Sequence, residues 1–218
     1  MRIIDDTGKK LTPATRNWFY AVTVLIALAN ILMFAVYGSD VPGISHRPGW
    51  GTFSVNNLLQ ALINTFSHAN RQHVLLNMLC FVIAGSYLER KMGSLRFLLF
   101  MILLCFFMGL AVSANNIGFN WHGFSGANYG LYGYILLDYL FTLARRRTRT
   151  LFNIMYGAVI IALIYFAMCF SGGVSHIGFE WYPYDLLHNL GHASGFAVGL
   201  LLGLCLPLSA ILIEKETA

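Results

Sequence analysis

Long apolar stretches separated by short polar connections dominate this chain and set the tightest limit on its fold. A helix needs roughly 20 apolar residues to cross the hydrocarbon core of a bilayer, which is about 30 Å thick. Six stretches qualify as candidates: Asn17–Tyr37, His73–Leu88, Phe97–Ala114, Phe124–Leu143, Phe152–Phe170 and Leu186–Leu208. Only 11% of the 218 residues are charged, against about 25% in soluble domains. The sequence therefore predicts an all-α integral membrane protein with six transmembrane helices.

The first stretch, Asn17–Tyr37, competes with a signal peptide as an interpretation. It is longer than the usual 7–15-residue hydrophobic region of a signal peptide, and no clear small-residue cleavage site follows it. We expect it to be a retained helix. The second and fourth stretches begin with polar residues, so hydropathy alone ranks them lowest.

The basic residues predict the orientation of these helices. Twelve of the fourteen lie before the first stretch, between the second and third, between the fourth and fifth, or in the tail, which leaves Arg47 and Arg71 on the other side. The positive-inside rule then places both termini in the cytoplasm. The net charge of +5 reflects this topology, so no nucleic-acid partner is expected.

One domain accounts for the chain. We expect a cytoplasmic segment over 1–16, a six-helix domain over 17–208 and a cytoplasmic tail over 209–218. In the outer connection Gly38–Gln72, the semi-polar segment Val55–Phe66 is expected to lie in the membrane interface rather than cross it. The aromatic outer loop Ser171–Asp185 fits anchoring at the level of the headgroups.

The four cysteines give no sign of a disulfide framework or a metal site. They all lie in apolar runs and are expected to be small buried side chains: Cys80, Cys105, Cys169 and Cys205. No CxxC pair or Cys/His zinc spacing is present.

Hydrogen-bonding side chains fall at one depth on three different predicted helices. With the topology above, Asn77, Ser125 and His192 lie on the order of 5–10 Å below the outer ends of their helices. An interhelical hydrogen bond in a membrane contributes only about 0.6 kcal/mol on average, whereas an unpartnered polar group in hydrocarbon costs several times that. Polar side chains in this position are therefore candidates for a functional site.

The fourth stretch opens with a serine between glycines, Gly123-Phe124-Ser125-Gly126. Glycines let the backbone approach a bound atom closely. The unpaired N–H groups at a helix N-terminus suit the oxyanion that forms when a serine attacks a carbonyl. Ser125 is therefore a candidate nucleophile.

The sixth stretch supplies a candidate base, His192. Glycines recur there every four residues, at 191, 195, 199 and 203, and the fourth stretch has small residues at Gly126 and Gly130. Such faces let helix backbones pack closely, which would bring His192 within reach of Ser125. No acidic residue is placed to orient the imidazole, so the pair is expected to act as a dyad.

The second stretch carries His73 and Asn77 at positions i and i+4, on one helical face. Both side chains can donate hydrogen bonds to an oxyanion beside the Ser125 amide. The alternative is that His73 only caps the helix at the water interface.

Together these residues resemble the rhomboid family of intramembrane serine proteases, in order and over most of Phe66 to Gly203. The matching motifs are His68-x4-His73-x3-Asn77, Gly85-x3-Glu89-x3-Gly93, Gly123-Phe124-Ser125-Gly126 with Tyr129, and Gly191-His192-x2-Gly195-x3-Gly199. The resemblance implies a six-helix bundle around a water-filled cavity open to the outer face.

The resemblance also implies roles for these residues. Ser125 would be the nucleophile and His192 the general base, with His73, Asn77 and the Ser125 amide stabilising the oxyanion. Tyr129 would pack against His192, and His68, Gly123 and Gly126 would support the site. The substrates would be transmembrane proteins cut in or near their membrane segments, and no metal or cofactor is implied. A short chain without a targeting segment is expected in a cell membrane such as the bacterial inner membrane.

One departure from the family pattern is visible. Many members carry a Trp-Arg pair shortly before the first motif histidine, where this chain has Leu59-Gln60. That difference concerns the first outer loop rather than the proposed catalytic residues. His188 matches nothing in the motifs.

Three alternatives stay open on the sequence alone. A catalytically inactive rhomboid-like chaperone or trafficking protein would share the fold, although such proteins usually lose the serine or the histidine. A metal or haem protein would use His68, His73, His188 and His192, but there is no HExxH motif. A transporter would be expected to show broken helices in corresponding positions of two halves, and no such symmetry is found.

Overall fold

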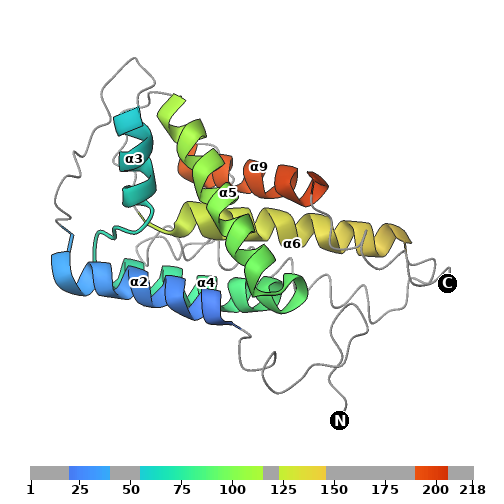
Figure 1. Ribbon diagram of the computed structural model, residues 1–218, viewed down its shortest axis with the longest axis horizontal. Helices are drawn as coiled ribbons and strands as arrows, with labels where there is room; N and C mark the ends of the chain where they lie inside the picture. The colour runs from blue at the N-terminus through green and yellow to red at the C-terminus, as the bar shows by residue number, and fades with distance from the viewer. Residues whose placement is uncertain (1–19, 40–54, 115–122, 146–189, 206–218) are drawn as a thin grey trace, which may run out of the picture.

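The computed structural model describes residues 20–39, 55–114, 123–145 and 190–205. In this part of the chain all regular structure is helical, and there is no strand. Figure 1 shows the helices, which are α2 (Ala21–Tyr37), α3 (Val55–Asn64), α4 (Arg71–Met92), α5 (Ser94–Ala114), α6 (Ser125–Arg145) and α9 (Leu190–Cys205).

Five of these six helices correspond to predicted spans, with ends that move by a few residues. The predicted fifth span, Phe152–Phe170, and the aromatic loop Ser171–Asp185 lie outside the described residues. The sixth helix is α3, a ten-residue helix within the segment expected to lie in the interface. Figure 1 shows α3 running across the direction of α2, α4 and α6, as an interfacial helix would.

The apolar helices differ in length. Among the described residues, one helix is long and apolar enough by itself to cross a membrane, over Ser94–Val112, with a mean hydropathy of 2.5. The apolar parts of α2 and α9 are shorter. In α4 and α6, polar residues such as Asn77, Asn128 and Asp138 are buried inside the bundle, which explains why hydropathy ranks these two helices low.

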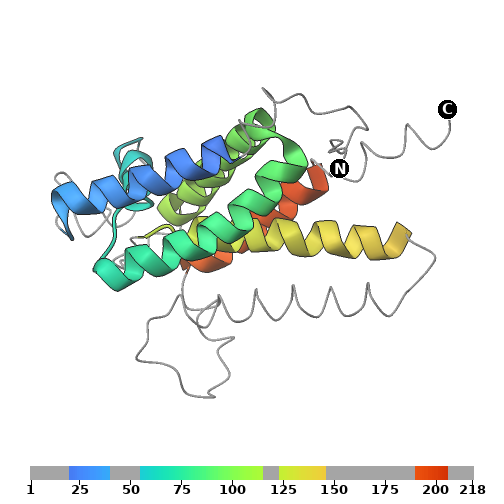
Figure 2. The same ribbon diagram turned by 90° about the horizontal axis from the view of Figure 1, so that it is seen from below.

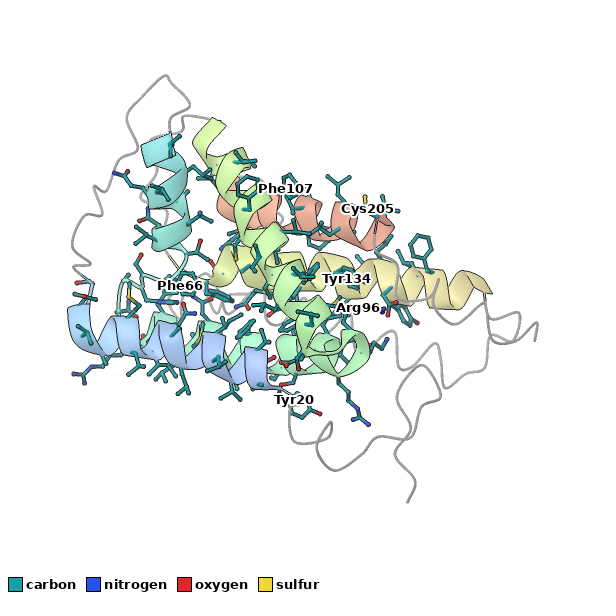
Figure 3. All side chains as sticks on the ribbon, viewed as in Figure 1. Tyr20, Phe66, Arg96, Phe107, Tyr134 and Cys205 are labelled. Atoms are coloured by element: carbon teal, nitrogen blue, oxygen red, sulfur yellow. The ribbon has the colours of Figure 1, made fainter. Side chains whose placement is uncertain are left out.

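Aromatic and aliphatic side chains from α4, α5 and α6 form the core. Phe81 of α4 meets Phe124 edge-on with ring centroids 4.8 Å apart, and Phe100 of α5 meets Tyr134 of α6 in the same way at 5.0 Å. Figure 3 shows Tyr134 inside the bundle where α5 crosses α6. The first contact holds the residue just before Ser125 against the middle of α4, and the second holds α6 against α5.

The side chains that face outward are largely apolar. Large exposed residues include Leu25 and Val36 on α2, Leu75 on α4 and Leu95 on α5, all more than 60% exposed. Glu89, Asn77 and His192 are buried at 3% exposure or less. So many large exposed apolar side chains are unusual for a soluble protein.

The cysteine prediction is wrong at one position. Cys205, at the end of α9 (Figure 3), is exposed, as is the neighbouring Leu204, because no described residue covers this side of the helix end. Cys80 and Cys105 are half-buried, and Cys169 lies outside the described residues.

Close backbone packing joins α6 to α9. A Cβ added to Gly195 would overlap the carbonyl oxygen of Gly126, and one added to Gly199 would overlap that of Gly130. A Cβ on Gly133 would lie 2.5 Å from the carbonyl oxygen of Phe196. The predicted packing of the two small-residue faces is therefore confirmed.

A buried carboxylate ties α2 to the end of α4. Glu89, which is fully buried, accepts hydrogen bonds from the backbone N–H groups of Val22 (3.1 Å) and Thr23 (2.8 Å) and from the hydroxyls of Thr23 and Ser94 (both 2.7 Å). A carboxylate near a helix N-terminus satisfies N–H groups that have no partner inside the helix. Glu89 thus fixes where α2 begins relative to the turn at Gly93 between α4 and α5.

An ion pair joins the C-terminal part of α4 to α6. Lys91 Nζ lies 2.8 Å from Asp138 Oδ2 and 4.6 Å from the centre of the Tyr87 ring. Burial alone would lower the pKa of Lys91, but its hydrogen bonds to Asp138 and Tyr87 outweigh burial and raise that pKa. The pair joins the C-terminal end of α4 to the middle of α6.

Candidate active site

Ser125 is the first residue of α6, and the segment before it is held by the last residue of α3, Asn64, and by His68 in the connection after α3. The backbone N–H of Gly123 donates to the carbonyl oxygen of Asn64 (2.9 Å), and that of Phe124 donates to Nε2 of the buried His68 (3.4 Å). Because Nε2 accepts this bond, the neutral His68 ring carries its proton on Nδ1. These two hydrogen bonds, to Asn64 and His68, fix the position from which α6 starts.

His192 of α9 faces Ser125. The Nε2 atom of His192 lies 2.7 Å from Oγ of Ser125, and the two residues are only 3% and 4% exposed. The sequence interval between them is 67 residues, so the contact depends on the close packing of α6 against α9. A neutral imidazole at this distance can accept the hydroxyl proton.

Tyr129, one turn after Ser125, stacks on the His192 ring. The ring centroids are 4.2 Å apart and the planes differ by 10°. Tyr129 is 1% exposed, so the stack is held rigidly. It keeps the imidazole plane in the orientation that directs Nε2 at Ser125.

The described carboxylates are committed elsewhere. Asp138 pairs with Lys91, and Glu89 binds the start of α2. Neither is bonded to His192.

His73 and Asn77 lie over Gly123. A Cβ on Gly123 would be 2.6 Å from Cε1 and 2.9 Å from Nε2 of His73, and 3.4 Å from Nδ2 of Asn77. Gly123 has a φ of +113°, which L side chains rarely adopt. The backbone at Gly123 therefore passes close beneath two side chains of α4.

The side-chain amide nitrogen of Asn77 is a buried hydrogen-bond donor without an acceptor among the described residues. Asn77 is 2% exposed, and its Nδ2 has no hydrogen-bond partner among the described residues. A buried donor without a partner costs free energy of about 1–3 kcal/mol. Such a cost is common where a protein keeps a donor for a bound group.

The eight residues named from the sequence gather in one place. His68, His73 and Asn77 line one side of the Gly123 segment, while Ser125, Gly126 and Tyr129 meet α9 on the other, at His192. A Cβ on Gly126 would lie 2.9 Å from the carbonyl oxygen of Gly191. His188 lies outside the described residues, and Leu59, at the unusual Leu59-Gln60 position, is exposed on α3.

Sequence reasoning missed Asn128. This residue of α6 is 3% exposed, and its Nδ2 donates to the carbonyl oxygen of Asn77 (3.0 Å). Its position three residues after Ser125 puts it near the same face of the helix. A polar residue at that spacing inside an apolar stretch was the available signal.

Among the described residues, no cluster of three His, Cys, Asp or Glu side chains is arranged to hold a metal ion.

Comparison with known proteins adds one finding to this geometry. The family model of the Rhomboid domain matches residues 55–208. The chain belongs to the rhomboid family. The match includes every residue of the site described above, from His68 to His192. No curated protein gives a match to the chain.

Rhomboid proteins are membrane proteins, and the family consists in general of intramembrane serine proteases. The match begins at α3 and leaves α2 outside it. In this rhomboid protein α2 is nonetheless bound to the matched part through Glu89.

Proposed function

We propose that this protein is an active intramembrane serine endopeptidase in which Ser125 is the nucleophile and His192 the general base. The observation that carries the proposal is the 2.7 Å contact between Ser125 Oγ and His192 Nε2 in a buried setting. Inactive family members are expected to lack one of these two side chains, and this chain has both.

The chemistry follows from the groups present. His192 takes the proton of Ser125 as Oγ bonds to the carbonyl carbon of the scissile peptide. The oxyanion then accepts hydrogen bonds from Asn77 Nδ2, from His73 and from the backbone N–H of Ser125. Collapse of the tetrahedral intermediate breaks the C–N bond, and His192 gives its proton to the leaving amine. Water, activated by the same imidazole, hydrolyses the acyl-enzyme.

We further propose that the bundle crosses the membrane with both termini in the cytoplasm and that its substrates are transmembrane proteins. The apolar outer surface and the buried polar site support placement in a bilayer. The basic residues support the orientation. The site then lies toward the outer face, where a substrate helix can be unwound.

The test is cleavage of a transmembrane test substrate by the purified protein in lipid. We expect the wild type to cleave, and Ser125→Ala and His192→Ala each to lose at least about 10³-fold in kcat. Ser194→Ala is the matched control, because Ser194 is a buried serine of α9 whose hydroxyl, among the described residues, bonds to the carbonyl oxygen of Gly191 and not to the site. It should keep its activity.

Two results would contradict the proposal. Cleavage that persists in Ser125→Ala would exclude this nucleophile. A wild-type protein that folds but cleaves none of a panel of substrates would favour the inactive chaperone or trafficking role. A chelator should leave the rate unchanged, which separates the dyad from the metal alternative.

A further inference from the structure

Asn128 lies between the nucleophile helix and the proposed oxyanion donor. It is on α6 one turn after Ser125, and α6 lies beside α4 (Figure 2). Its Nδ2 is 3.0 Å from the carbonyl oxygen of Asn77 and 3.5 Å from the side-chain oxygen Oδ1 of the same residue. Two buried amides thus face each other across the interface of the two helices.

The first of these bonds determines which way the Asn128 amide points. A backbone carbonyl oxygen only accepts hydrogen bonds, so the Asn128 atom beside it must be the NH2 group. The same NH2 group then faces the side chain of Asn77. It attracts the oxygen of that side chain and repels its nitrogen, because two donors would otherwise meet in a buried place.

The orientation of Asn77 follows from this contact. With Oδ1 turned toward Asn128, the Nδ2 of Asn77 points to the other side of its amide plane. There it lies 3.4 Å from the position of a Cβ on Gly123, in the space that His73 also borders. The unpartnered Nδ2 of Asn77 is therefore directed to where an oxyanion would form.

We infer that Asn128 is a positioning residue that fixes the Asn77 amide with its NH2 group toward the oxyanion. The inference rests on the proposed function, since it assigns a second residue behind the proposed donor. Asn128 does not touch the substrate. Because it sits on the helix that carries Ser125, it also couples the position of the nucleophile to that of the donor on α4.

Two isosteric variants test the inference. Asn128→Leu removes the NH2 group and leaves Asn77 free to turn. Asn128→Asp places a second acceptor opposite Asn77 Oδ1 and favours the reversed amide. Removing one oxyanion donor lowers kcat by about 10²–10³-fold, so we expect Asn77→Ala to lose that much and each Asn128 variant to lose roughly tenfold or more. KM should change little.

A double-mutant cycle separates positioning from packing. If Asn128 acts only through Asn77, Asn128→Leu should have no further effect on kcat in an Asn77→Ala background. Asn30→Leu is the matched control, because Asn30 is a fully buried asparagine on α2 that bonds only locally, to the carbonyl oxygen of Ile26. It should leave kcat unchanged, whatever it does to the thermal unfolding temperature.

The outcomes distinguish the inference from the proposed function. A wild type that cleaves, with Asn128→Leu as active as wild type or with effects that multiply in the double variant, would overturn the role of Asn128 alone. If Asn128→Leu does not fold, Asn128→Asp with and without Asn77→Ala gives the same comparison. A Ser125→Ala variant that still cleaves would overturn the proposed function and, with it, this inference.

Discussion

At the scale of single residues, Gly123 shows how closely the site is built. Its backbone has a φ of +113°, and the space above it is occupied by His73 and Asn77. A side chain here would be strained by the backbone and would also push the proposed oxyanion donors away. Glycine at this position therefore serves both the turn into α6 and the approach of α4.

We predict that Gly123→Ala lowers kcat by about 10²-fold or more, since it displaces His73 and Asn77 together. Gly93→Ala is the control. Gly93 also has a positive φ, of +80°, but a Cβ there would meet nothing within 4 Å. It should cost backbone strain of about 1–3 kcal/mol in stability, because this φ combined with a ψ of 153° is almost confined to glycine, and it should leave kcat as it is. Cleavage rates and thermal unfolding of both variants check this, and equal activities would contradict it.

The sequence predicted which residues form the site more completely than it predicted the contacts between them. The glycine repeats on two stretches were enough to predict that His192 meets Ser125, because small faces at fixed spacing specify close packing. Asn128 was not recognised, since its role depends on the register between α4 and α6. No local pattern in the sequence specifies that register.

At the scale of helices, the α6–α9 seam decides the geometry of the pair. The two backbones touch at Gly130 and Gly199, and again where Gly126 meets Gly195. Farther along, a Cβ added to Gly203 would lie 3.0 Å from Cδ2, at the end of the flexible Leu137 side chain. The seam is thus backbone against backbone near the site and backbone against side chain away from it.

We predict that Gly199→Ala destabilises the protein and separates Ser125 from His192, because the added methyl group meets a backbone carbonyl that cannot move aside. Overpacking of this kind costs about 1–3 kcal/mol. Gly203→Ala should be tolerated, since Leu137 can change rotamer. Thermal unfolding and kcat measured on both variants test the difference. If Gly199→Ala matches Gly203→Ala in both, the seam does not control the site.

Helix existence was predictable from the apolar stretches, but helix partners were not. The motif around Glu89 was visible in the sequence, yet nothing there showed that its carboxylate binds the start of α2, 66 residues earlier. The segment expected at the interface contains α3, whose role in holding Gly123 through Asn64 also appears only in three dimensions.

At the scale of the whole molecule, the proposed function gives the helix bundle a definite orientation in the membrane. The proposed site lies at the start of α6, and the Lys91–Asp138 pair lies farther along the same helix. In the orientation proposed above, the basic residues put the level of the Lys91–Asp138 pair on the cytoplasmic side, and the site faces the outside.

We predict that a cysteine at Ser39, just after α2, reacts with a membrane-impermeant maleimide in intact cells. A cysteine at Thr148 should react only after the membrane is opened. Both are made in a variant in which the four native cysteines are replaced, because Cys205 is exposed on the surface. The opposite pattern would contradict the topology and move the proposed site to the cytoplasmic side.

Covalent labelling tests directly whether Ser125 is a nucleophile activated by His192. It requires no knowledge of the substrate. The purified protein in lipid is treated with a fluorophosphonate, and the modified residue is identified by mass spectrometry. We expect an adduct on Ser125 in the wild type and a labelling rate at least about 10²-fold lower in His192→Ala, because the imidazole would no longer take the hydroxyl proton. A folded wild type that is not labelled at Ser125, or a His192→Ala variant that is labelled equally fast, would contradict it.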